Sequence, residues 1–166
     1  MYKIKQFFKR IYNLYRWFPI IWKDQDWDDY YIFEILKFKL KNQSKYIGYH
    51  DRHTTAKRDA EKMMLCVRLI DKVQDEYYGC EYQDYHNIDL KFIESKDHPD
   101  SCEVKIIEKS ECYDEYFKKY PLIYRMVPDL QAPKSKIAFQ IARINEERAH
   151  KLLFKILEQN IRRWWD

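Results

Sequence analysis

Three tryptophans alternate with carboxylates near the start of the chain, and this cluster holds the side chains best suited to binding a nucleotide. An indole offers a flat face on which a nucleobase stacks, and a carboxylate accepts hydrogen bonds from a base amino group or a ribose hydroxyl. We predict stacking by Trp22 and Trp27, and polar contacts by Asp24 and Asp26. The alternative is that these tryptophans fill the core and the aspartates cap the following helix.

Cationic side chains surround the predicted start of a helix near residue 54. Exposed amides and the positive end of the helix dipole attract phosphate groups. We predict that phosphates are bound by Arg52, His53, Lys57 and Arg58. The alternative is a threonine cap beside solvated cations. His50 and His53 lie three residues apart, but no four-ligand spacing accompanies them, so we predict no metal site.

The chain ends in arginines followed by two adjacent tryptophans. Neighbouring residues of a helix point about 100° apart, so one indole can enter the core while the other reaches a groove or a second chain. We predict that Arg162 and Trp165 complete the nucleotide pocket, either within one chain or from a second subunit. The alternative is that the arginines only complement the helix dipole.

No catalytic signature occurs in the sequence, which lacks a G-x-S-x-G motif, a P-loop, a Rossmann fingerprint and an H-E-x-x-H motif. Two glycines in the whole chain also disfavour a glycine-rich loop around phosphates. We therefore predict a protein that is not an enzyme and has no cofactor.

Hydrophobic spacing predicts four main helices and one hairpin. Apolar residues recur every three or four positions over residues 2–15, 27–45, 54–78 and 135–166, and they alternate with polar residues over 88–92 and 104–106. Pro19 and Gly48 are expected to end helices, and Gly79 to cap the third helix. Asp24 or Asp26 is expected to cap the second helix, and Thr54 or Thr55 the third.

These elements predict a mainly α-helical, single-domain bundle spanning residues 1–166. The chain is rich in hydrophobic residues (46%) and aromatic residues (17%), which is too apolar for a disordered protein. The hairpin belongs to an acidic insertion at about residues 80–117.

Charge is segregated along the chain. Residues 1–16 carry five basic and no acidic side chains, residues 17–78 are balanced, residues 79–117 carry four basic and eleven acidic side chains, and residues 118–166 carry eleven basic and five acidic side chains. Basic ends around an acidic middle indicate self-complementary association or an anionic ligand held by the ends. The alternative is a set of solvated helix faces.

The four cysteines form no C-x-x-C pair, and no secretory signal precedes them. We therefore expect reduced thiols. No stretch approaches the roughly 18 apolar residues that span a bilayer. The sequence predicts a cytoplasmic protein without a membrane partner.

Two motifs resemble a widespread family of small tailed-bacteriophage proteins that has no established activity. They are W-F-P-I-I-W-K-D-x-D-W-D at residues 17–28 and I-R-x-W-W-D at residues 161–166, and residues 34–40 and 60–66 add to the resemblance. The resemblance implies a phage origin, expression in the cytoplasm of the infected bacterium and an accessory role without catalysis.

Three functions remain open at this point. The leading hypothesis is a sponge that sequesters a nucleotide-derived small molecule, such as a bacterial immune signal, and so acts against host defence. The first alternative is a nucleic-acid-binding protein that uses the basic N-terminal and C-terminal helices. The second is an inhibitor that covers a host protein with its aromatic surface. A homo-oligomer is open in each case, because a second subunit can complete the pocket.

Overall fold

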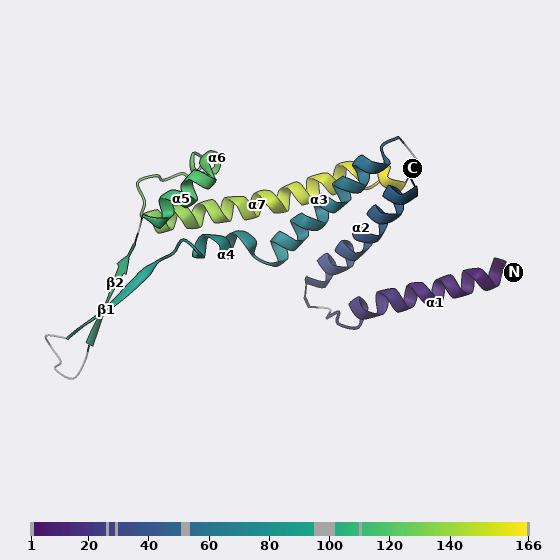
Figure 1. The fold of residues 1–166 in the computed structure, drawn as a ribbon, viewed down its shortest axis with the longest axis horizontal. Coiled ribbons are helices and arrows are strands. Elements are labelled where there is room, and N and C mark those ends of the chain that lie inside the picture. The colour runs from purple at the N-terminus through teal and green to yellow at the C-terminus, as the bar shows by residue number, and fades with distance from the viewer. Residues whose placement is uncertain are drawn as a thin grey trace. The chain divides into compact units, whose positions relative to one another are not determined.

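The computed structural model describes residues 2–25, 27–28, 30–50, 54–94, 102–109 and 111–165. The chain is mainly helical with a small antiparallel hairpin in the middle, which confirms the predicted fold class. The elements, drawn in Figure 1, are α1 (Tyr2–Ile21), α2 (Tyr30–His50), α3 (Ala56–Gln74), α4 (Tyr77–Gln83), β1 (Ile88–Glu94), β2 (Cys102–Glu108), α5 (Cys112–Lys119), α6 (Pro121–Tyr124), α7 (Lys134–Asn160) and the 3-10 turn η1 (Arg163–Trp165).

The chain divides into two compact units. Unit 1 consists of Met1–Gln74 and Leu153–Asp166, and unit 2 consists of Asp75–Leu152. Helix α7 contributes its first five turns to unit 2 and its end to unit 1. A single domain over residues 1–166 stays a prediction.

Unit 1 is built around the pair α2 and α3, on which the end of the chain packs. Helical spacing places their apolar residues on facing sides, and burial of these side chains supplies most of the stabilisation. The buried apolar side chains of unit 1 are Leu40, Ile47, Ala56, Met63, Cys66, Val67, Leu69, Ile70, Leu153, Leu157 and Trp164.

Gly48 does not end α2, which continues to His50, so this predicted helix end is wrong. A Cβ atom built on Gly48 would lie 3.5 Å from the Cβ of Ala60. The glycine therefore lies where α2 and α3 approach each other closely, and helix packing has overridden its low helix propensity.

Replacing Gly48 by alanine is expected to stabilise unit 1 by about 0.5–1 kcal/mol, because alanine favours the helix and 3.5 Å is an ordinary van der Waals contact. Urea unfolding of the variant measures this gain. Gly79→Ala in α4 is the matched control, since its new Cβ would have no atom within 4 Å. A loss of stability in Gly48→Ala alone would mean that the helices cannot accept one extra methyl group.

Two other predicted helix ends are wrong. Helix α1 runs through Pro19 to Ile21, because a proline in the last turns removes few helical hydrogen bonds, and the Trp22 amide still donates to the Phe18 carbonyl at 2.8 Å. Helix α3 ends at Gln74, since Glu76 adopts a left-handed conformation with φ 46°, and Gly79 lies inside α4.

The caps of α2 and α3 lie close to their predicted positions. The Asp28 carboxylate accepts a hydrogen bond from the Tyr30 amide at 2.9 Å, so Asp28 rather than Asp24 begins α2. Asp26, the other predicted cap, lies outside the described residues. Thr55 directly precedes α3, and its carbonyl accepts from the Asp59 amide at 2.9 Å.

Unit 2 has its own aromatic core, which lies between α5, α6 and the first part of α7. Its buried members are Tyr113, Tyr116, Ile123, Val127, Ile137, Ala138 and Ile141. The hairpin pairs Leu90 with Ile106 and Phe92 with Val104. The alternating pattern that predicted the strands thus places these four apolar side chains on one face of the sheet.

A buried carboxylate ties α4 to α5 in unit 2. Glu81 accepts hydrogen bonds from Lys119, from the Tyr120 hydroxyl at 2.5 Å and from the Tyr77 hydroxyl at 3.3 Å. Burial alone would raise the pKa of Glu81, but the hydrogen bonds from Lys119 and Tyr120 outweigh it and hold the pKa below its ordinary value.

This lowered pKa predicts loss of stability in acid. The contribution of Glu81 is present above its unfolded pKa of about 4.5 and disappears as the pH falls through the lower folded value. Glu81→Gln is expected to cost about 1–3 kcal/mol at pH 7. Urea unfolding at pH 7 and pH 3 should show a smaller pH effect in this variant than in the parent chain. An equal pH effect in both would remove Glu81 as a source of acid sensitivity.

Candidate functional site

The turn between α1 and α2 exposes two of the predicted stacking residues. Trp22 is 75% exposed and Trp27 is 81% exposed, so neither indole fills the core. Asp24 is also exposed, as is Lys23 between it and Trp22. We call these four residues the tryptophan corner. The corner presents ring faces, a hydrogen-bond acceptor and one cation to solvent, and Asp26 lies outside the described residues.

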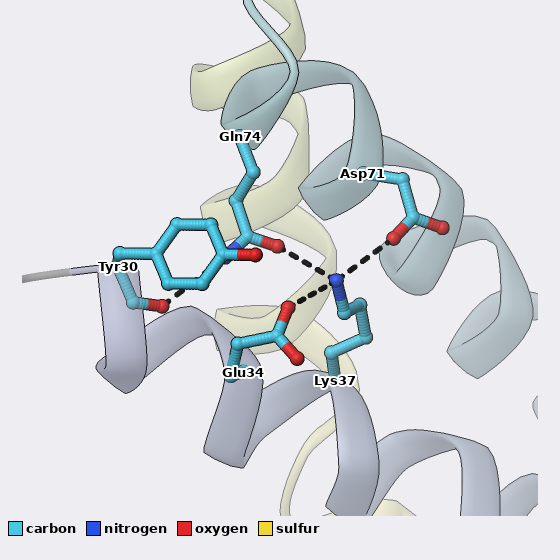
Figure 2. Close-up of polar contacts among 5 residues, drawn as sticks. All are labelled: Tyr30, Glu34, Lys37, Asp71 and Gln74. Carbon is cyan, nitrogen blue, oxygen red and sulfur yellow. Dashed lines mark hydrogen bonds and ion pairs between the residues drawn. The ribbon is translucent and has the colours of Figure 1, made fainter. Parts of the chain in front are cut away.

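A half-buried lysine fixes the helix that follows the corner (Figure 2). The Lys37 ammonium of α2 contacts Glu34, the Asp71 carboxylate at 3.1 Å and the Gln74 amide oxygen at 2.8 Å. The amide nitrogen of Gln74 donates in turn to the Tyr30 carbonyl at 3.1 Å. The first turns of α2 are therefore tied to the end of α3, which gives the exposed corner a rigid support.

Charge compensation keeps this lysine ionised. Burial would lower the pKa of Lys37, but the hydrogen bonds to Glu34 and Asp71 outweigh it and raise the pKa. The ammonium is fully used by its three partners, so Lys37 supports the corner instead of binding a ligand.

Helix α1 runs back along α2 in the antiparallel direction. Arg16 donates a hydrogen bond to Asn42, and the Trp17 ring packs edge-on against Phe38 with 4.6 Å between centroids. Both contacts join the last turns of α1 to the middle of α2, and the helices diverge toward their other ends (Figure 1).

Two of the four predicted phosphate-binding residues lie at the opposite end of α2 from the tryptophan corner. Lys57 and Arg58 are exposed in the first turn of α3, and Arg52 and His53 lie outside the described residues. Because α2 has 21 residues, it separates this cluster from the tryptophan corner by roughly 30 Å. The structure therefore does not bring Trp22 and Trp27 together with Lys57 and Arg58 in one pocket.

The end of the chain joins the phosphate cluster. Trp164 is only 3% exposed, and its carbonyl accepts from the Gln43 side chain at 3.5 Å. Lys62 of α3 donates to Asn160 at 2.6 Å. These contacts hold exposed Arg162 beside the end of α2 and the start of α3. The side chain of Trp165 lies outside the described residues.

The basic half of α1 points in the same direction as the end of α2 but diverges from it (Figure 1). Its side chains Tyr2, Lys3, Gln6, Phe7 and Arg10 line a shallow hollow, in which aromatic rings lie beside cations. We use the name cationic end of unit 1 for the exposed cations of this part of α1 together with those at the end of α2, the start of α3 and the end of the chain, and they are Lys3, Lys5, Lys9, Arg10, Lys45, Lys57, Arg58, Arg162 and Arg163.

Only three members of the cationic end belong to the set predicted from the sequence. The members that belong to α1 could have been predicted from the sequence, because residues 1–16 carry five basic and no acidic side chains. Within the part of the chain that the structure describes, Lys57, Arg58, Arg162 and Arg163 take part in no ion pair. The charge of these four side chains is thus available to an anionic partner.

The remaining chemistry of the described residues is sparse. They contain no group of three or more metal-ligating side chains. Burial raises the pKa of the Cys66 thiol to about 11, so it stays protonated and unreactive at neutral pH. No described helix has the length and apolar character required to cross a bilayer.

Comparisons of the chain with protein-family models, with curated proteins and with solved structures found no match. The resemblance to phage proteins stays a prediction.

Proposed function

We propose that this protein binds nucleic acid, without catalysis, through the cationic end of unit 1. The observation that carries the proposal is the convergence of exposed cations from the end of α2, the start of α3 and the end of the chain, to which the basic half of α1 adds a further exposed basic surface. A surface that neutralises several phosphates at once releases their counterions, and this release supplies most of the affinity of non-specific nucleic-acid binding.

The charged and aromatic groups are distributed over a wide surface, which favours a nucleic-acid strand over a mononucleotide as the ligand. Pockets for small ligands are concave and bury most of the ligand. The cations here lie on an open surface, and the exposed ring of Tyr2 lies beside those of α1. Single-stranded nucleic acid binds to such surfaces, because its phosphates track the cations while its bases stack on exposed rings.

An accessory role in the cytoplasm of an infected bacterium is part of this proposal. It rests on the resemblance of residues 17–28 and 161–166 to phage proteins. Nucleic-acid binding agrees with that setting, since phage and host nucleic acids are present there in excess.

The test is a fluorescence-anisotropy titration of the whole protein with a labelled 20-nucleotide single strand. For about four phosphate contacts, we expect the affinity to fall roughly 50-fold between 50 and 200 mM salt. Duplex DNA and RNA in parallel titrations identify the preferred form. Failure to bind any of the three at 50 mM salt would reject the proposal.

A nucleotide-derived small molecule bound at the tryptophan corner is the second candidate. The exposure of Trp22 and Trp27 on either side of Asp24 favours it, because the rings can stack on a base while the carboxylate accepts from it. In this form of the sponge hypothesis, Lys23 replaces the distant Lys57 and Arg58 as the phosphate contact.

Thermal unfolding with a panel of cyclic and ADP-ribose nucleotides tests the second candidate. A ligand at one hundred times its dissociation constant stabilises the folded state by roughly 2.7 kcal/mol. The gain should disappear in Trp22→Ala and persist in Lys57→Glu. No shift with any member of the panel would reject a site for these nucleotides at the corner.

A further inference from the structure

Helix α1 exposes a broad apolar face that nothing described in unit 1 covers. No residue of the helix is buried. Positions three, four and seven apart share one side of a helix. This rule places eight large exposed side chains together, and we call them the α1 apolar face: Ile4, Phe7, Phe8, Ile11, Leu14, Tyr15, Phe18 and Ile21.

The opposite side of α1 is the one that faces α2. The contacts with α2 come from Arg16 and Trp17, and the other half-buried side chains of α1 are Gln6 and Ile20, which share that side. The apolar face therefore points away from unit 1. An exposed surface of this kind indicates an interaction site.

The hairpin of unit 2 carries a second exposed apolar face. The cross-strand pairs Leu90 with Ile106 and Phe92 with Val104 share one side of the sheet, and all four side chains are exposed. A two-stranded hairpin is at best marginally stable in water unless a partner covers one face. We call these four residues the hairpin apolar face.

Charge distinguishes the two faces. Residues 1–16, which form most of α1, carry five basic and no acidic side chains, whereas the two strands of the hairpin carry two basic and four acidic ones. Two α1 helices would bring like cations together, and two hairpin segments would bring an excess of anions together. Pairing of unlike faces joins apolar surfaces and opposite charges at the same time.

We propose that the α1 apolar face of one copy of this chain packs on the hairpin apolar face of a second copy. Each apolar face is thus covered by the unlike face of another copy of the same chain. The contact joins two unlike faces, so every copy offers one α1 face and one hairpin face, and two such contacts close a two-fold dimer. An interface of standard size buries about 800 Å² per partner, which two such contacts in a reciprocal dimer supply more readily than one.

The test uses two variants that place a charge at the centre of each face. Phe8→Glu changes α1 at a side chain that is 65% exposed, and Phe92→Glu changes the hairpin at one that is 71% exposed, so neither should unfold its unit. Asn13→Glu on the other side of α1 and Ile93→Glu on the other face of the hairpin are the controls. The readout is the mass from light scattering after nuclease treatment.

The parent chain and both controls should have at least twice the mass of one 20.8 kDa chain. Phe8→Glu and Phe92→Glu should each be monomeric alone, since each lacks one half of every contact. A mixture of the two retains one intact pair of faces and should form a dimer, which needs a higher protein concentration than the parent dimer because it has one contact instead of two.

Three outcomes would overturn the proposal. These are a monomeric parent chain, a mixture that stays monomeric, and a Phe92→Glu protein that still assembles through α1 alone. A monomeric parent that binds vesicles of anionic lipid, and loses this binding in Phe8→Glu, would assign the α1 face to a membrane surface. Oligonucleotide affinity is measured separately, so failure here is distinguishable from failure of the proposed function.

Discussion

Reversing the charge of Lys57 and Arg58 to glutamate is expected to weaken oligonucleotide binding about 100-fold at 50 mM salt, or about tenfold for each reversed charge. Both side chains are exposed and form no ion pair with the described residues, so their charge acts on the ligand and not on the fold. The two introduced glutamates lie in the first turn of α3, where the positive end of the helix dipole stabilises negative charge. The variant should therefore keep its melting temperature, and anisotropy titration measures the loss of affinity.

A matched variant separates this local effect from a change in net charge. Lys118→Glu with Lys136→Glu alters the net charge equally, but both lysines lie in unit 2 and are exposed. This control should retain most of the affinity at 50 mM salt. Equal weakening in both variants would show that binding follows net charge and not the cationic end.

Replacing Tyr116 by alanine is expected to destabilise unit 2 by about 3–5 kcal/mol, because the ring is fully buried and its removal leaves a cavity. The ring packs against Tyr85 at 5.1 Å and Tyr120 at 5.3 Å between centroids. Urea unfolding followed by circular dichroism measures the loss.

The conservative change at the same position should have a different result. Among the described residues, the buried hydroxyl of Tyr116 has no hydrogen-bond partner. Tyr116→Phe removes this unsatisfied group and keeps the ring, so stability should stay unchanged or rise by up to about 1 kcal/mol. A loss comparable to that of Tyr116→Ala would mean that the hydroxyl, and not the ring, stabilises unit 2.

The sequence was sufficient to predict the types of the main elements. Side chains alternate across a strand and repeat every three or four residues on a helix, so Leu90, Phe92, Val104 and Ile106 could be assigned to one hairpin face. The helix ends failed at Pro19, Gly48 and Gly79. At Gly48 the close approach of Ala60 explains the failure, because a contact between helices outweighs the propensity of one residue.

The candidate site was predicted less well, for two different reasons. The separation of Trp22 and Trp27 from Lys57 and Arg58 could have been read from the sequence, because the predicted helix between them already implied a long distance. The position of Arg162 beside α3 could not, since it depends on tertiary contacts from Trp164 to Gln43 and from Asn160 to Lys62. Local patterns contain no signal for such contacts.

Ultraviolet cross-linking to a photoreactive single strand, followed by peptide mass spectrometry, tests the central claim most directly. The cationic end predicts cross-linked peptides from three regions, namely the first turn of α3, the segment around Arg162 and the basic half of α1. These cross-links should weaken as salt rises. Cross-links confined to the tryptophan corner, or to unit 2, would contradict the claim that the cationic end is where nucleic acid binds.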